Sequence, residues 1–214
     1  MARLASTEER ISKIISILKK AYPDARCQLN FKTPFELLIG VILSAQCTDK
    51  KVNEITPGLF KKYKNAKGFA TARTPELEKD IRPTGFYKNK TKSIQNCCRA
   101  LVSKHKNKLP QDLDELVELP GVGRKSANAI RVHAFGKPGI VVDTHMLRVS
   151  ERLGFTKGKN ADKVEHQLNE LVPKSKWSVF SNVINIHGRR VCSAKKPACP
   201  DCPVRSLCPS FGKI

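Results

Sequence analysis

The chain has 214 residues, the length of one large domain or two small ones, and its 40 Lys and Arg against 19 Asp and Glu give a formal net charge of +21. Hydrophobic residues make up 40% of the chain, which is enough for a buried core and excludes a disordered chain. The longest apolar run, Leu37 to Leu43, is too short to cross a bilayer, and the N-terminus lacks an apolar signal core, so we expect neither secretion nor a membrane anchor.

The first two predicted helices begin at recognisable capping signals. Ser6 and Glu9 have the spacing of a capping box, and apolar residues at helical spacing follow them. Thr33, Pro34 and Glu36 repeat the signal with a Thr cap, Pro at the first helical position and Glu at the third.

The rest of the chain is a succession of expected helices joined by short Gly and Pro turns. Further helices are expected near residues 49–62, 75–81, 88–104, 112–118, 124–135, 144–153, 161–172 and 176–187. Gly136, Gly154 and Gly188 occupy positions where helices would end. The one β-like run, residues 139–142, is too short for a sheet, so the predicted fold class is all-α.

The positive charge is clustered, and a polyanion such as nucleic acid is the expected partner. Residues 88–108 include no acid and the cations Lys88, Lys90, Lys92, Arg99, Lys104, Lys106 and Lys108. The tail from Arg189 onward is also basic, with a single acid, Asp201. The alternative is a charged surface that serves only solubility.

The segment Leu119 to Lys125 reads Leu-Pro-Gly-Val-Gly-Arg-Lys between two predicted helices. Gly121 and Gly123 let the backbone turn sharply and approach a ligand, and the following helix directs free N–H groups outward at its positive end. This pattern indicates a helix-hairpin-helix that grips a DNA strand through its phosphates without reading sequence. The alternative is an ordinary turn between helices.

Two residues could carry chemistry near this motif. Lys125 lies in the first turn of the helix after the hairpin, where the helix end and partial burial would both favour a neutral, nucleophilic amine that can form a Schiff base. Alternatively, Lys125 contacts phosphate. Asp143, directly after an apolar run, could take a proton from such an amine or stabilise positive charge on a sugar, and it could also cap the next helix.

Four of the eight cysteines fall close together near the C-terminus and predict a metal site. They are Cys192, Cys199, Cys202 and Cys208. Four thiolates suit Zn²⁺ or a [4Fe–4S] cluster, and a single Cys-x-x-Cys favours the cluster, because zinc ribbons usually pair two such knuckles. Lys195 and Lys196 project from the first loop of this site, where they could touch a DNA backbone.

Over nearly its whole length the chain resembles the endonuclease III family of helix-hairpin-helix DNA glycosylases. The resemblance rests on five segments: residues 44–49 (Ser-Ala-Gln-Cys-Thr-Asp), 119–125, 142–145 (Val-Asp-Thr-His) and 187–189 (His-Gly-Arg), and the four-cysteine tail. It implies an all-α fold with a six-helix domain at 27–137 and a discontinuous cluster domain at 1–26 and 138–214, carrying one [4Fe–4S] cluster. DNA would bind across the cleft between them.

The resemblance also implies an activity: excision of oxidised pyrimidines by a bifunctional DNA glycosylase and AP lyase, with β-elimination 3′ to the lesion. Lys125 then matches the Schiff-base nucleophile and Asp143 the catalytic carboxylate. Gln46 matches the residue that fills the gap left by the flipped nucleotide, although it could instead simply end the preceding helix. Phe86 matches an apolar wedge on the opposite strand, and Thr84 stands where a bulkier apolar residue is expected.

Two other functions are open to the same sequence. Monofunctional adenine- or thymine-mismatch glycosylases share the fold, but the adenine-mismatch enzymes have Ser in place of Lys125. A non-catalytic DNA-binding protein could use the hairpin and a metal staple, although mere binding requires neither Lys125 nor Asp143. The expected partner is double-stranded DNA with a damaged pyrimidine or an abasic site, bound by a monomer in the nucleoid of a prokaryote-like cell.

Overall fold

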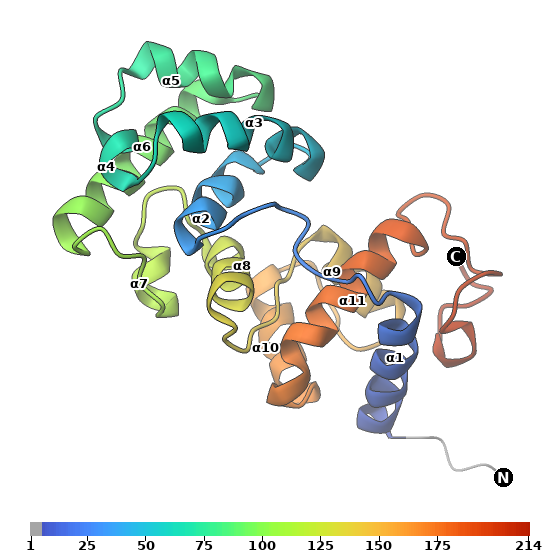
Figure 1. Ribbon diagram of the computed structural model, residues 1–214. Helices are drawn as coiled ribbons and strands as arrows, with labels where there is room; N and C mark the ends of the chain where they lie inside the picture. Colours follow the sequence, from blue (N-terminus) through green and yellow to red (C-terminus); the bar gives the residue numbers. More distant parts are fainter. Residues whose placement is uncertain (1–5) are drawn as a thin grey trace, which may run out of the picture. The chain divides into compact units, whose positions relative to one another are not determined.

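The structure is a computed structural model in which residues 6–214 are described. The chain divides into two compact units (Figure 1). The hairpin unit is Cys27–Gly136, and the cysteine unit joins the described residues up to Arg26 to Lys137–Ile214. Both units are built from helices, and no strand occurs in residues 6–214, so the all-α prediction is confirmed.

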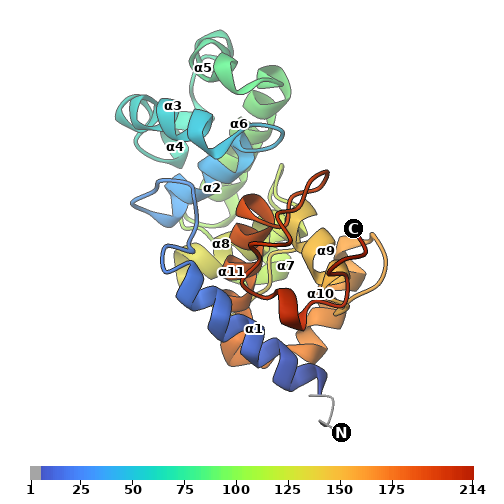
Figure 2. The same ribbon diagram turned by 90° about the vertical axis from the view of Figure 1, so that its right-hand side faces the viewer.

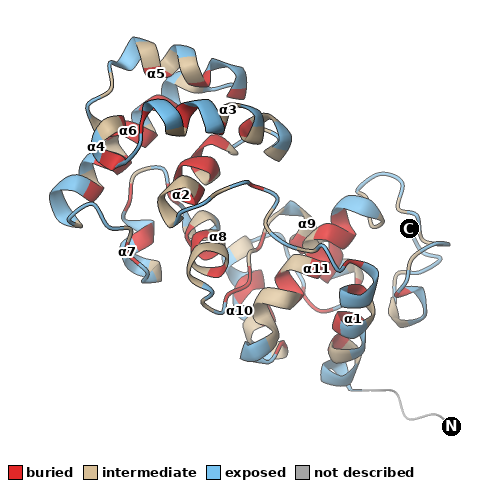
Figure 3. Ribbon diagram, viewed as in Figure 1, coloured by how far each residue is buried: buried red, intermediate tan, exposed pale blue. Residues whose placement is uncertain are grey.

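The hairpin unit is organised around α2 (Pro34–Leu43), which is apolar on nearly every side. Its buried residues include Leu37, Leu38, Ile39, Ile42 and Leu43 (Figure 3). Around it lie α3 (Asp49–Lys62), α4 (Ala66–Ala70), α5 (Thr74–Ile81), α6 (Tyr87–Lys104), α7 (Leu113–Val117) and α8 (Arg124–Phe135), with a 3₁₀ turn, η1 (Arg82–Thr84). The short α4 was not among the helices expected from the sequence.

The cysteine unit is built around α11 (Trp177–Arg190), which packs against α9 (Thr144–Arg152) and α1 (Thr7–Ala21). Figures 1 and 2 both show α1 alongside α11, although they come from opposite ends of the sequence. The remaining elements are α10 (Ala161–Leu171) and the 3₁₀ turns η2 (Lys174–Lys176) and η3 (Arg205–Leu207). A common core includes Ile11, Ile14 and Leu18 of α1.

Local signals placed most helix ends correctly. The Ser6 hydroxyl accepts from the Glu9 amide and the Glu9 carboxylate accepts from the Ser6 amide, which is the predicted capping box. The Thr33 side chain caps α2 by accepting from the Glu36 amide at 3.2 Å. Gly136 ends α8 in the left-handed conformation, as expected. No helix in the described part of the chain is long and apolar enough to cross a membrane.

Gly188 does not end a helix, and that prediction is wrong. It lies inside α11, buried against α9, where an added Cβ would come within 2.9 Å of His145 Cβ and 3.1 Å of Val149 Cγ2. The missing side chain therefore serves close packing between two helices rather than a turn.

Candidate functional site

The hairpin loop between α7 and α8 has the geometry of a backbone phosphate site. Gly121 has φ +83°, and an added Cβ would lie 2.8 Å from Ser93 Cβ, so both its conformation and its contact require glycine. Gly123 is the N-cap of α8, and an added Cβ there would meet no described atom within 4 Å. The first amides of α8 thus have no capping side chain and lie at the positive end of a 12-residue helix.

Lys125 is the second residue of α8, and its side chain is exposed. The expectation of partial burial is therefore wrong. Its position beside the uncapped helix end agrees with the expectation. The amine is therefore accessible to solvent.

Gln46 and Phe86 lie at two exposed tips, each in the left-handed backbone conformation with φ 52° and 47°. For residues with a Cβ this conformation costs about 1 kcal/mol, and such outliers cluster at functional sites. α2 ends at Leu43 with Ser44 as its cap, and the Gln46 side chain forms no hydrogen bond within residues 6–214. Phe86 is 61% exposed, a large apolar side chain left in solvent.

Two neighbours of Phe86 lie inside the unit rather than on its surface. Thr84 is buried, with its hydroxyl donating to the Ile81 carbonyl at 2.8 Å, so its side chain is not part of an exposed wedge. Lys90, one of the cations of the basic segment 88–108, is only 5% exposed, so its charge is not on the surface of the unit. Burial lowers the pKa of Lys90, because the charged ammonium loses its hydration.

Asp143 is the N-cap of α9, as one of the two interpretations anticipated. Its Oδ1 accepts from the amides of His145 at 3.0 Å and Met146 at 2.8 Å. Its Oδ2 accepts from Asn185 Nδ2 at 2.6 Å. The preceding segment is held by Ser181 of α11, whose hydroxyl accepts from the Val141 amide at 2.9 Å.

Sequence reasoning missed Asn185 and Ser181, which position this carboxylate. They are four residues apart and so share one face of α11, next to its apolar positions. This polar pair on a mostly buried helix was the available signal. This signal does not identify Asp143 as the residue that Asn185 contacts.

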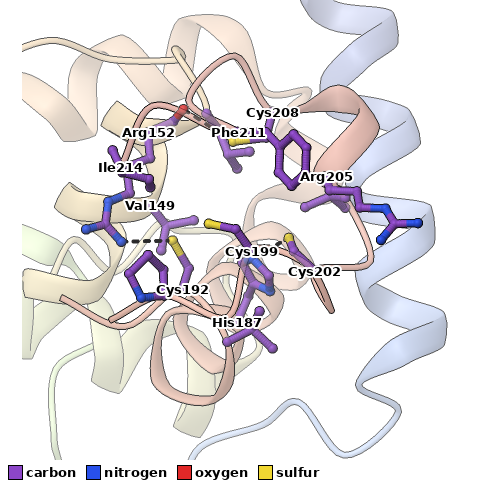
Figure 4. Close-up of a pocket in the computed structure, with 14 residues that line it drawn as sticks. Val149, Arg152, His187, Cys192, Cys199, Cys202, Arg205, Cys208, Phe211 and Ile214 are labelled. Carbon is purple, nitrogen blue, oxygen red and sulfur yellow. Dashed lines mark hydrogen bonds between the residues drawn. The ribbon is translucent and has the colours of Figure 1, made fainter. Parts of the chain in front are cut away.

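The four predicted metal-ligating cysteines line one pocket (Figure 4), whose empty space, including the part open to solvent, is about 380 Å³. Much of the remaining wall is apolar, including Val149, Leu153 and Val204. Within residues 6–214, no three His, Cys, Asp or Glu side chains converge closely enough to hold a single metal ion. The structure thus brings the four thiols to one pocket.

Two arginines of α9 hold the first cysteine of the pocket. Arg152 Nη1 donates to Cys192 Sγ at 3.3 Å and to the Ser193 carbonyl at 2.7 Å. Arg148 Nε donates to the Cys192 carbonyl at 3.0 Å. The helix that Asp143 caps therefore also supports the start of the cysteine loop, whose residues Lys195 and Lys196 are exposed.

A buried histidine supports the other side of the pocket. The Nδ1 of His187 lies 2.9 Å from the Tyr22 hydroxyl, and its Nε2 lies 3.6 Å from Cys202 Sγ. Burial lowers the pKa of His187 to about 4, so the ring is neutral at pH 7. With Tyr22 donating to Nδ1, the Nε2–H is free to donate to a thiolate at Cys202.

The chain is similar in sequence and in structure to known DNA repair proteins. A model of the HhH-GPD superfamily of base excision DNA repair proteins matches residues 39–174. Endonuclease III of Synechocystis sp. is 46% identical over 211 residues, covering 98% of this chain and 96% of that protein. A non-covalent endonuclease III–DNA complex superimposes with a TM-score of 0.92 at 44% identity, covering 99% of this chain and 98% of that one. A trapped endonuclease III–DNA covalent intermediate matches with the same TM-score and identity, covering 99% of both chains.

Proposed function

Since the chain belongs to the endonuclease III family of the HhH-GPD superfamily, it is a DNA glycosylase with AP lyase activity, and we propose that it excises oxidised pyrimidines from double-stranded DNA. The observation that carries this proposal is an exposed amine, Lys125, in the first turn after an uncapped hairpin. A protein that only bound phosphate would need the hairpin amides but not a nucleophile beside them. We place the enzyme on nucleoid DNA as a monomer.

Binding begins with the hairpin. The amides at the start of α8 donate to phosphate oxygens, with Gly121 and Gly123 allowing the backbone to approach the strand. Because a base cannot be attacked within the stack, the damaged nucleotide is extruded. Gln46 enters the gap and Phe86 wedges the opposite strand, since both are exposed at the tips that carry them.

Chemistry then proceeds at the sugar. The Lys125 nitrogen forms a bond to C1′ as the bond from C1′ to the base breaks, and the base departs with the electron pair and takes up a proton. The sugar ring opens to an imine, the C2′ proton is lost, and the C3′–O bond breaks, which cuts the strand 3′ to the lesion. Asp143 assists by taking a proton from the Lys125 amine and by stabilising positive charge at the sugar.

Cys192, Cys199, Cys202 and Cys208 are proposed as the ligands of one [4Fe–4S] cluster. The four thiols line one pocket, and their single Cys-x-x-Cys favours a cluster over zinc, because zinc ribbons usually pair two such knuckles. Two donors face the sulfurs, Arg152 at Cys192 and His187 at Cys202, as bound thiolates require. The cluster would staple the loop that presents Lys195 and Lys196 to the DNA backbone and take no redox part in excision.

Borohydride trapping tests the proposal. The protein is incubated with duplexes that each carry one oxidised pyrimidine, an adenine mismatch, a thymine mismatch or an abasic site. A covalent complex with the oxidised-pyrimidine and abasic duplexes is expected. Base release from a mismatch without trapping would favour a monofunctional mismatch glycosylase. Binding with neither release nor trapping would favour a non-catalytic DNA-binding protein.

A further inference from the structure

Lys90, the fourth residue of α6, keeps its ammonium inside the hairpin unit without a carboxylate partner in the described part of the chain. Its Nζ donates to the Leu43 carbonyl at 2.8 Å and to the Thr84 carbonyl at 2.8 Å. A buried charge is costly unless its hydrogen bonds are satisfied, and here main-chain oxygens satisfy it. The two carbonyl groups have the same kind of position in the fold.

Each carbonyl ends a helical element just before an exposed tip. Leu43 is the last residue of α2, three residues before Gln46, and Thr84 is the last residue of η1, two residues before Phe86. The amide of Cys47 turns away from α2 and donates to the Ser44 carbonyl, which leaves the Leu43 carbonyl without its helical partner. A cation at the C-terminal end of a helix is also favoured by the helix dipole.

We propose that Lys90 is a positioning residue that ties together the two tips and holds Gln46 and Phe86 ready to enter the DNA stack. This inference rests on the proposed function, in which those side chains replace the extruded nucleotide. Both tips have left-handed backbones at residues with a Cβ, so something must hold them against relaxation. The ammonium suits that task, because its rotatable donors reach two oxygens on separate segments, whereas a planar guanidinium carries its donors in a rigid fork.

A purely structural role would have a different signature. If Lys90 only satisfied the core, its loss would lower stability and slow excision equally on every substrate. If it positions the tips, its loss must matter most where a paired base has to be extruded and the gap filled. The ratio of the excision rate on paired duplex to the rate on single strand therefore distinguishes the two roles, whereas the excision rate on one substrate does not.

The test compares Lys90→Met with Lys92→Met, which removes a charge from an exposed position of the same helix. Single-turnover excision of one oxidised pyrimidine is measured in paired duplex and in single strand. Lys90→Met should lose about tenfold or more on duplex relative to single strand, while Lys92→Met keeps the wild-type ratio. In a Gln46→Ala background the added loss from Lys90→Met should shrink, because the two act through one step. An unchanged ratio, or losses that multiply, would overturn the inference.

A binding measurement keeps this result independent of the proposed chemistry. 2-Aminopurine is placed opposite a tetrahydrofuran abasic analogue, and its fluorescence reports insertion of the tips without any excision. Lys90→Met should reduce the fluorescence change at saturating protein even if the wild type excises no oxidised pyrimidine. A change equal to that of the wild type would reject the positioning role. Should Lys90→Met fail to fold, Lys90→Gln takes its place, because Gln supplies an uncharged amide donor instead of the ammonium. If neither variant folds, Lys90 has a global structural role and the inference is overturned.

Discussion

The Asn185 amide donates to the free oxygen of the Asp143 carboxylate at 2.6 Å, while the other oxygen caps α9. One carboxylate therefore caps α9 with one oxygen and keeps the other, oriented by Asn185, for the chemistry proposed above. The capping oxygen accepts two main-chain amides and the other oxygen is oriented by α11. Because the two functions use different oxygens, a substitution can separate them.

Asp143→Asn should retain the cap, because Asn is as good an N-cap as Asp, and change stability by less than about 1 kcal/mol. Base excision should slow by about 10²-fold or more, since the uncharged amide cannot take a proton or stabilise a sugar cation. Thermal unfolding and single-turnover excision measure the two effects. Asn185→Leu is the companion variant and should slow excision less, because the carboxylate remains. A wild-type excision rate in Asp143→Asn would leave Asp143 as a helix cap only.

Lys125→Ala should abolish borohydride trapping and strand cleavage while leaving DNA binding largely intact, because the hairpin amides remain. Its exposed side chain supports no packing, so stability should change by less than about 0.5 kcal/mol. Trapping assays and a binding titration on the same abasic duplex provide the measurements. Undiminished trapping would remove Lys125 from the nucleophile role.

The two hairpin glycines should respond differently to alanine. Gly121→Ala should destabilise the protein by about 2 kcal/mol, because the left-handed φ and the contact with Ser93 both oppose a Cβ. Gly123→Ala should leave stability within about 0.5 kcal/mol, because an added Cβ meets no atom within 4 Å, but it should weaken DNA binding by adding a methyl group where the strand is proposed to approach the backbone. Denaturant unfolding and DNA titration of both variants check this. Normal binding by Gly123→Ala would argue that phosphate does not approach there.

The proposed [4Fe–4S] cluster would give the protein a brown colour and broad visible absorption, and Cys199→Ser should abolish both. It should also destabilise the C-terminal loop, because folding and metal binding are coupled. DNA affinity should fall with it as Lys195 and Lys196 lose their support. Visible absorption and a DNA titration measure both effects. Cys47→Ser, outside the pocket, is the control and should stay brown. A Cys199→Ser protein that keeps its colour and its affinity would contradict the ligand assignment.

Gln46→Ala should reduce excision from paired duplex far more than excision of the same lesion in single strand. The flipped base can fall back into an open gap with a gain of a few kcal/mol of pairing and stacking, and in the proposed mechanism the Gln46 amide blocks that return. The ratio of the two single-turnover rates is the measurement. An equal loss on both substrates would reject gap filling. The alternative that Gln46 ends α2 does not hold, because Ser44 is the C-cap and the Gln46 side chain is exposed and forms no hydrogen bond within residues 6–214.

The sequence by itself determined where most of the helices lie and which residues carry reactive groups. Capping at Ser6 and Thr33 and the αL end at Gly136 depend on atoms a few residues apart, so their signals are complete within a short window. The same holds for the hairpin, where Gly121 needs its left-handed turn whatever surrounds it. Spacing likewise showed that four cysteines belong together, and the pocket that they line agrees with it.

Only the tertiary structure decided what each of several residues faces. Lys90 reads as one cation among many, yet it bonds a carbonyl 47 residues away, and Asn185 is tied to Asp143 across 42 residues. Gly188 looks like a helix end but is a packing contact, and Lys125 is exposed although partial burial was expected. Burial and hydrogen-bond partners are set by segments that meet only in the folded chain, and local propensity does not encode which segments those are.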